Sequence, residues 1–148
     1  MISGVVAGYL VTGGDYKGAI VGGVAGVIPD LDEPNSKFGK MTLPISVPLN
    51  NIFGHRTFTH SLLFVSLNFI TFFFLIFTEL WIALAVSSGI LAHILGDMLT
   101  GKVKFLYPSQ KSIGIRIKPS MFVPIDRVAR YSLFAYFVIL VAKDFNIL

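Results

Sequence analysis

The sequence predicts an all-α protein: a polytopic membrane helical bundle of about four to five helices, with a small cytoplasmic β-hairpin or extended loop. Of its 148 residues, 54% are hydrophobic and only 14% are charged, whereas soluble domains are typically about 25% charged. The hydrophobic residues are grouped in uncharged stretches, and most basic residues lie between these stretches. The length suits one membrane-embedded domain, residues 1–148. The chain has no cysteine, so disulfides and thiolate chemistry are excluded.

Five apolar stretches predict the helices in order. They are Gly4–Thr12, Gly18–Pro29, Ser61–Phe77, Leu80–Leu95 and Ser132–Ala142. A membrane-spanning helix needs about 20 apolar residues, so the last three stretches can span if their helices continue into the polar flanks. The first two are short, and they predict either short spans or a hairpin that enters the bilayer and returns. A cleaved signal peptide is not expected, because the first basic residue is Lys17.

Glycines are spaced four residues apart in both N-terminal stretches. Gly4 and Gly8 form one pair, and Gly18, Gly22 and Gly26 continue the spacing in the second stretch. Small residues on one helix face allow two backbones to approach closely in lipid. We therefore expect the first two helices to pack tightly against each other or against a neighbour.

The basic residues predict the orientation of the helices. Most of them lie in two connections, one before Ser61 and one after Leu95. They are Lys37, Lys40, Arg56, Lys102, Lys104, Lys111, Arg116, Lys118, Arg127 and Arg130. Loops rich in Lys and Arg stay on the cytoplasmic side of a membrane. If all five stretches span, the N-terminus is cytoplasmic and the C-terminus lies outside.

Both basic connections show local patterns. Ile113, Ile115 and Ile117 alternate with Gly114, Arg116 and Lys118, and such a period of two indicates a strand. Residues 102–106 form a second candidate strand, so these segments predict the hairpin. Residues 41–53 are apolar but interrupted by two prolines, which predicts a segment lying along the bilayer interface.

All three histidines and half of the eight acidic residues lie in three short segments. The segments are Pro29–Glu33, Gly54–Ser61 and His93–Asp97, and each lies at the cytoplasmic end of a predicted helix. His93 and Asp97 share a helix face, because they are four residues apart. Asp30 and Asp32 are two apart, so they are expected on the turn that follows a helix. The three segments should therefore meet at one depth in the membrane.

Ionisable groups at membrane depth are costly and usually functional, and clustered carboxylates repel one another unless a cation intervenes. Asp and His donors suit a divalent metal. We expect zinc first, with manganese or magnesium as alternatives. The predicted ligands are Asp30, Asp32, His55, His60, His93 and Asp97. A network of Asp–Lys/Arg ion pairs at the interface is the main alternative.

Three residues are the predicted catalytic groups. His55 is either a ligand or the proton donor to a leaving group, and His55 or an unligated carboxylate such as Asp32 would take the proton of an attacking water. Arg56 is a forked cation beside His55 that suits a phosphoryl or carboxylate group. Contact with a lipid headgroup is the competing interpretation of Arg56.

These motifs resemble the YdjM-type family of inner-membrane, metal-dependent hydrolases, some bacterial members of which are under LexA control. The matching residues are Pro29–Asp32 with Pro34 and Ser36, Gly54–Arg56 with Thr59–Leu62, and His93–Leu95 with Asp97–Thr100. The resemblance runs from about Ala19 to Pro108. It implies a multi-pass protein of the inner membrane with a hydrolytic metal site, but it supplies no substrate.

The chain departs from the family pattern at three places. Many members carry a histidine before the first helix, where this chain has Ile2 and Ser3, and a histidine after the second aspartate, where it has Glu33. Glu33 is a candidate substitute oxygen ligand. Members also carry an acidic residue before the last helix, and Asp126 is the candidate here.

The leading functional prediction is a metal-dependent hydrolase that cleaves a phosphoester of a lipid or other amphiphile at the cytoplasmic face. Its partners would be membrane lipids and an amphiphilic or phosphorylated small molecule. A metal-stabilised or metal-sensing membrane scaffold without catalysis is the alternative. A transporter is disfavoured because no charge lies in the middle of a predicted span. Nucleic acid is not an expected partner, because the basic loops lack interleaved aromatic residues.

Overall fold

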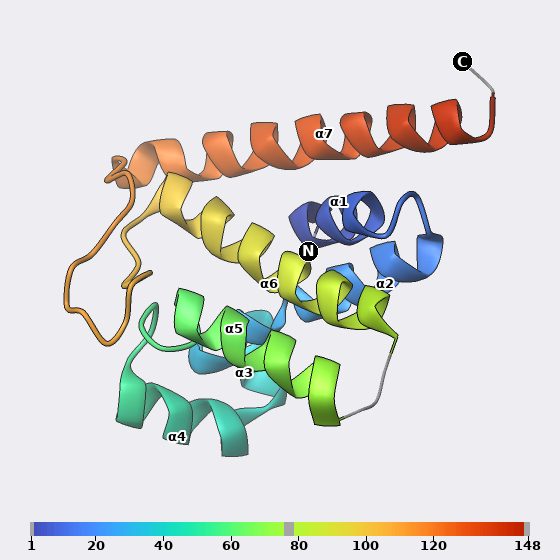
Figure 1. Ribbon diagram of the computed structural model, residues 1–148. Coiled ribbons are helices and arrows are strands. Elements are labelled where there is room, and N and C mark those ends of the chain that lie inside the picture. The colour runs from blue at the N-terminus through green and yellow to red at the C-terminus, as the bar shows by residue number, and fades with distance from the viewer. Residues whose placement is uncertain (1, 76–78, 147–148) are drawn as a thin grey trace.

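The computed structural model describes residues 2–75 and 79–146, which form seven α-helices and two short helices of other types (Figure 1). The helices are α1 (Ile2–Val11), α2 (Tyr16–Ala25), α3 (Lys37–Met41), α4 (Leu43–Phe53), α5 (Leu62–Ile70), α6 (Leu80–Thr100) and α7 (Pro119–Asp144). The 3₁₀ helix η1 (Ile28–Asp32) follows α2, and the π-helix η2 (Thr71–Leu75) continues α5. The prediction of an all-α fold is confirmed for the described residues.

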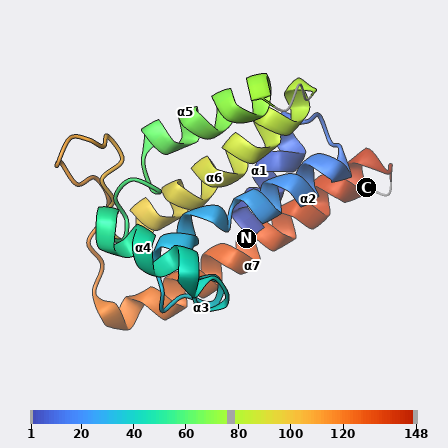
Figure 2. The same ribbon diagram turned by 90° about the horizontal axis from the view of Figure 1, so that it is seen from below.

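Helix α6 is the centre of the arrangement. The α1–α2 pair packs on one side of α6 and α5 packs on the other (Figure 2). The short helices α3 and α4 gather around η1, and α7 lies across α1 and α6 (Figure 1). This arrangement places η1, the segment before α5 and the C-terminal half of α6 next to one another, which are the three segments that carry the histidines and their acidic neighbours.

The glycine spacing produces the predicted close packing. A Cβ at Gly4 or Gly8 would collide with the backbone of α2, and a Cβ at Gly89 would collide with the backbone of Gly22. Backbones of α1, α2 and α6 therefore touch directly. Gly89 lies four residues before His93, so this contact draws the end of α2, and with it η1, towards the histidine.

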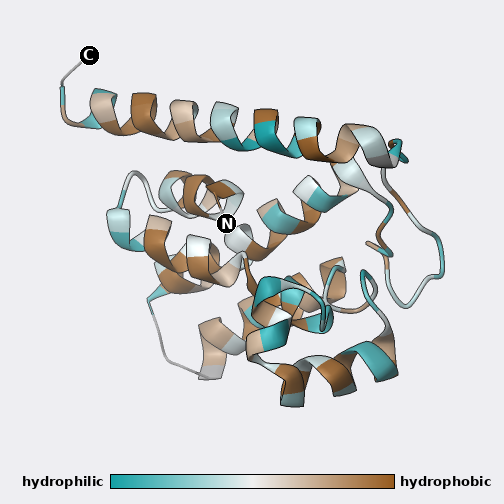
Figure 3. Cartoon of the chain, turned by 180° about the vertical axis from the view of Figure 1, so that it is seen from behind, coloured by the Kyte–Doolittle hydropathy of each residue, from teal (hydrophilic) through white to brown (hydrophobic). Residues whose placement is uncertain are grey.

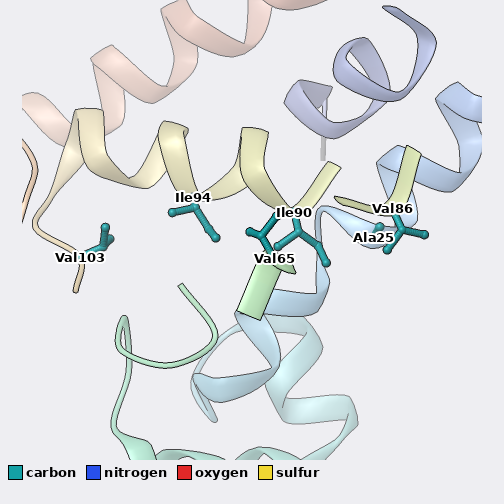
Figure 4. Packing of buried hydrophobic residues seen from close by; sticks show 6 residues of the cluster. All are labelled: Ala25, Val65, Val86, Ile90, Ile94 and Val103. Carbon is teal, nitrogen blue, oxygen red and sulfur yellow. The ribbon is translucent and has the colours of Figure 1, made fainter. Parts of the chain in front are cut away.

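The main hydrophobic cluster of the core comprises Ala25, Val65, Val86, Ile90, Ile94 and Val103, contributed by α2, α5, α6 and the loop after α6 (Figure 4). Further buried hydrophobic residues include Val6 and Tyr9 of α1 and Ala83 and Ala85 of α6. Many large hydrophobic residues are exposed instead, and the C-terminal half of α7 shows hydrophobic turns (Figure 3). Exposed apolar side chains in such number mark an interaction surface, and they agree with a lipid environment.

The number of membrane spans is the part of the prediction that the structure does not confirm. Among the described residues, α6 is the one helix long and apolar enough to cross a bilayer, whereas α1 and residues 62–74 form shorter apolar helices. The stretch Ser132–Ala142 lies inside the longer helix α7. The predicted end of the third stretch, residues 76–77, lies outside the described residues. Multiple spans therefore stay a prediction.

The predicted hairpin is an extended loop in the structure. Val103 and Ile113 form an isolated antiparallel bridge, with backbone N–H to O distances of 2.9 and 2.8 Å, and no strand is assigned within residues 2–75 and 79–146. The neighbouring amides bond elsewhere: that of Lys104 donates to Arg56 O, and that of Ile115 donates to Met98 O. Bonds to the helices and to the segment before α5 replace a strand ladder.

Candidate metal centre

Three segments distant in sequence bring metal-ligating atoms together. Asp30 lies on η1, His60 lies just before α5, and His93 lies on α6. One ligand atom from each residue lies within 4.8 Å of the other two. Two imidazole nitrogens and a carboxylate oxygen at this spacing could hold one divalent metal ion.

The local sequence explains how each segment turns its side chain into the cluster. Pro29 at the start of η1 follows the end of α2 and supports a tight 3₁₀ turn, which places Asp30 as the sequence predicted. Ser61 caps α5 by accepting a hydrogen bond from the amide of Phe64. His55 and His60 therefore both precede the helix.

The two imidazoles of the cluster each have a buried Nε2 atom that faces a carboxylate but makes no well-aligned hydrogen bond. His60 is fully buried, and Nε2 of His60 and Nε2 of His93 have no hydrogen-bond partner within the described part of the chain. Carboxylates lie close to both: His60 Nε2 is 3.2 Å from Asp97 Oδ2, and His93 Nε2 is 3.4 Å from Asp30 Oδ1. Buried polar atoms are normally satisfied, at a cost of about 1–3 kcal/mol when they are not. These donors therefore fit a metal ion.

Asp32 lies behind the cluster and is fully buried. Its Oδ1 is 2.7 Å from His55 Nδ1. Its Oδ2 accepts a hydrogen bond from the Thr59 hydroxyl and is 3.4 Å from His60 Nδ1. Both oxygens are thus engaged, and Asp32 holds His60 with Nε2 towards the cluster. Carboxylates commonly orient metal-binding histidines in this way.

The charges of Asp32 and His60 depend on each other. Burial alone would raise the pKa of Asp32, but its contacts with His55, His60 and Thr59 outweigh burial and hold that pKa well below the usual range. Burial alone would lower the pKa of His60, but the carboxylates of Asp32 and Asp97 outweigh it and raise the pKa to about 9. A metal ion that binds His60 must therefore displace a proton.

Arg56 is held beside the cluster by an unusual backbone. Its φ is 59°, a left-handed value that costs a non-glycine residue about 1–3 kcal/mol. Its Nε donates to Asp97 Oδ2 at 3.1 Å, and its carbonyl accepts from the amide of Lys104. A Cβ at Gly101 would collide with the guanidinium, so the glycine makes room for Arg56.

The cluster opens into a cleft of about 920 Å³. Asp30, His93, Asp97 and Arg56 line one wall, and residues of α7 line the other. His55 is not among the lining residues; its Nδ1 faces Asp32, and its ring centroid lies 5.5 Å from that of His60.

The predicted ligands thus fall into three groups. Asp30, His60 and His93 form the cluster, and Asp97 adjoins it through His60. Asp32 and His55 form the supporting pair, so neither contributes an atom to the cluster. Glu33 lies 3.7 Å from His55, and Asp126 pairs with Arg130 at 2.7 Å.

Two contributions to the site were missed from the sequence. The side-chain amide of Asn50 on α4 donates to the carbonyl of Asp32 at 2.8 Å; an amide within an apolar segment was the available signal. The second is the cleft wall supplied by α7, which places Arg127 and Arg130 near the cluster. These arginines were interpreted only as markers of orientation.

Comparison with known protein families finds a match over most of the sequence. The family described as YdjM inner membrane protein matches residues 1–145. Inner membrane protein YdjM of Escherichia coli (strain K12) is 42% identical over 88 residues, which cover 55% of this chain and 44% of that protein. Uncharacterized protein YvsG of Bacillus subtilis (strain 168) is 37% identical over 95 residues, covering 62% of this chain and 57% of that protein.

The chain spans about half the length of the curated relatives it matches. No solved structure matches it. The family match nevertheless extends over nearly every described residue, including all three segments that form the cluster. The chain therefore belongs to the YdjM family of inner membrane proteins.

Proposed function

We propose that the chain is a membrane-embedded, metal-dependent hydrolase that cleaves a phosphoester of a lipid or other amphiphile at the cytoplasmic face of the inner membrane. One observation carries the proposal. One ligand atom from each of Asp30, His60 and His93 lies within 4.8 Å of the other two, and Asp30 and His93 line a cleft. The mixed His/Asp donor set favours zinc, with manganese or magnesium as alternatives.

The residues have distinct roles in this proposal. Asp30, His60 and His93 would hold the ion, and three protein ligands leave a position for water, as catalytic zinc sites require. The ion would lower the pKa of bound water and offset charge that develops on phosphate oxygens. Asp97, which lines the cleft and adjoins His60, would be placed to accept the proton of a bound water. Arg56 holds an anionic oxygen of the substrate.

The cleft favours catalysis over a purely structural ion. A structural ion could also join η1, the segment before α5 and α6, but such sites are closed by protein ligands. Here Asp30 and His93 both line an open cleft beside Arg56. The basic loop after α6 adjoins this site through the Lys104–Arg56 contact, which supports a cytoplasmic orientation by the positive-inside rule.

The test is to purify the protein, measure its metal content, and follow metal-dependent release of phosphate from phosphorylated amphiphiles. We expect bound metal and hydrolysis in the parent protein. A variant carrying His60→Ala and His93→Ala should lose both. Asp97→Asn should keep the metal and lose at least about a hundredfold in rate, because it removes the proton acceptor.

The outcomes separate the two functions. Metal bound at full stoichiometry by the parent protein and lost by the double variant, without hydrolysis of any phosphoester, would favour the scaffold. Hydrolysis that is undiminished in the His60/His93 double variant would show that the chemistry does not use this site.

A further inference from the structure

The cleft beside the metal centre has two chemically different linings. Its apolar lining comes mainly from α7, through Phe122, Ile125, Ala129, Leu133 and Phe134. Its charged lining comprises three arginines and three aspartates, together with His93; the arginines are Arg56, Arg127 and Arg130. An apolar wall with a few charged groups is typical of a pocket that orients an amphiphilic ligand.

Two of the three arginines that line the cleft form ion pairs, and the third does not form one among the described residues. Arg56 is paired with Asp97 at 3.1 Å, and Arg130 is paired with Asp126 at 2.7 Å. Arg127 forms no ion pair with any residue in the part of the chain that the structure describes. An unpaired guanidinium that faces a cleft can bind a phosphate or other oxyanion through charge-assisted hydrogen bonds.

The apolar residues continue from the arginines along the same helix. Leu133 and Phe134 lie one to two turns after Arg127 and Arg130, and the hydrophobic part of α7 follows them (Figure 3). A ligand with its anionic head at the arginines therefore has a path for a hydrocarbon chain along α7. The volume of about 920 Å³ is at the upper end of ligand-binding pockets.

We infer that α7 recognises the substrate: Arg127 binds the phosphate of a long-chain amphiphile, and the wall formed by Leu133 and Phe134 binds its hydrocarbon chain. This inference rests on the proposed function in that it calls the bound molecule a substrate. The binding residues that it assigns lie outside the His/Asp cluster. Arg127 and Phe134 are then specificity residues. A free phosphate can contact Arg127 but has no hydrocarbon chain to contact Phe134.

Binding to metal-depleted protein tests the inference. The probes are dodecyl phosphate and inorganic phosphate, titrated by calorimetry into chelator-treated protein in an uncharged detergent. Dodecyl phosphate should bind more tightly, because each buried methylene contributes about fourfold in affinity. Arg127→Gln should weaken dodecyl phosphate about tenfold, because it removes a charge-assisted bond, and Arg127→Lys should restore part of the loss.

Matched controls separate the cleft from the rest of the surface. Arg116→Gln removes an exposed arginine of the loop after α6, which does not line the cleft, and should change affinity less than twofold. Phe134→Ser should weaken dodecyl phosphate and leave inorganic phosphate unchanged. Tyr136→Ser alters an aromatic residue of the same helix that does not line the cleft, and it should affect neither probe.

Two results would overturn the inference: equal binding of the two probes, or equal loss of affinity in Arg127→Gln and Arg116→Gln. Neither result depends on metal or turnover, so the proposed hydrolase can survive the failure of this inference. Conversely, a protein that binds dodecyl phosphate through Arg127 but holds no metal would retain the binding site and lose the hydrolase.

Discussion

At the residue scale, the contacts of Asp32 explain why the site contains an acidic residue that is not itself a ligand. Asp32 is fully buried and ionised, which is tolerable because His55, Thr59 and His60 surround its two oxygens. It contributes orientation to His60, and Asn50 in turn holds its backbone. Asp32, His55 and Asn50 therefore form a supporting layer around the candidate metal site.

The first prediction concerns this orientation. Asp32→Asn keeps the size of the side chain but removes the carboxylate that faces His60 Nδ1, so metal affinity should fall about 10–100-fold while the stoichiometry stays the same. Competitive titration against a zinc chelator measures the change. Asp15→Asn is the matched control, because Asp15 caps the opposite end of α2 and asparagine caps equally well. Unchanged affinity in Asp32→Asn would refute the orienting role.

The sequence identified the residues of the site better than their roles. Scarcity was the signal: all three histidines and half of the eight acidic residues lie in three short segments, each at the end of a predicted helix. The division into ligands and supporting residues could not be predicted, because it depends on which nitrogen of His60 faces Asp32. Spacing along a chain does not contain that information.

At the element scale, direct backbone contact between α2 and α6 sets the position of the cluster. Gly89 meets Gly22 one turn before His93, so the distance between Asp30 and His93 depends on a contact that tolerates no side chain.

The second prediction compares two glycines of α6. Gly89→Ala should destabilise the protein by about 1–3 kcal/mol, because its methyl group would overlap the backbone of Gly22. Gly96→Ala meets nothing within 4 Å and should be neutral or stabilise by up to about 1 kcal/mol through helix propensity. Thermal unfolding in mild detergent measures both variants. Equal shifts would contradict the direct contact.

The hydrophobic pattern predicted where the long helices lie, but it did not predict the residues at which they begin and end. α6 continues through polar residues to Thr100, and α7 begins at Pro119, ahead of its apolar stretch. The alternating isoleucines indicated a strand because a period of two shows only that every second side chain faces the same way. The pattern does not show which groups the backbone bonds to, and the amide of Ile115 donates to the carbonyl of Met98 and not to a neighbouring strand.

At the scale of the whole molecule, the His/Asp cluster joins three segments that are distant in the sequence. η1, the segment before α5 and α6 meet at Asp30, His60 and His93. An ion bound there would link these segments and so contribute to the tertiary stability.

The third prediction follows from this linkage. With zinc at 100 times its dissociation constant, the native state should gain about 2.7 kcal/mol, and a chelator should remove that gain. The melting temperature in detergent, measured with and without chelator, reports the effect. The His60→Ala, His93→Ala variant should melt at the same temperature in both conditions. An equal chelator effect in this variant would place the ion elsewhere.

The fourth prediction addresses orientation, and the absence of cysteine makes it simple to test. Ser109→Cys in the loop after α6 should react with a membrane-impermeant maleimide only from the cytoplasmic side. Lys17→Cys at the start of α2 should react only from the opposite side if α2 spans. Inverted and right-side-out vesicles distinguish the two. Labelling of both positions from one side would show that the α1–α2 pair enters the bilayer and returns.

One consequence follows from the exposure of α7. No described side chain of α7 is buried, yet this helix forms a whole wall of the cleft. The contacts of Tyr9 with Asp144 and Phe137 fasten the C-terminal part of α7 to α1. If α7 lies against lipid, the surrounding acyl chains would help to set the width of the cleft. Bilayer thickness and fluidity would then affect which molecules enter, and the proposed substrate selectivity should differ between micelles and native lipids.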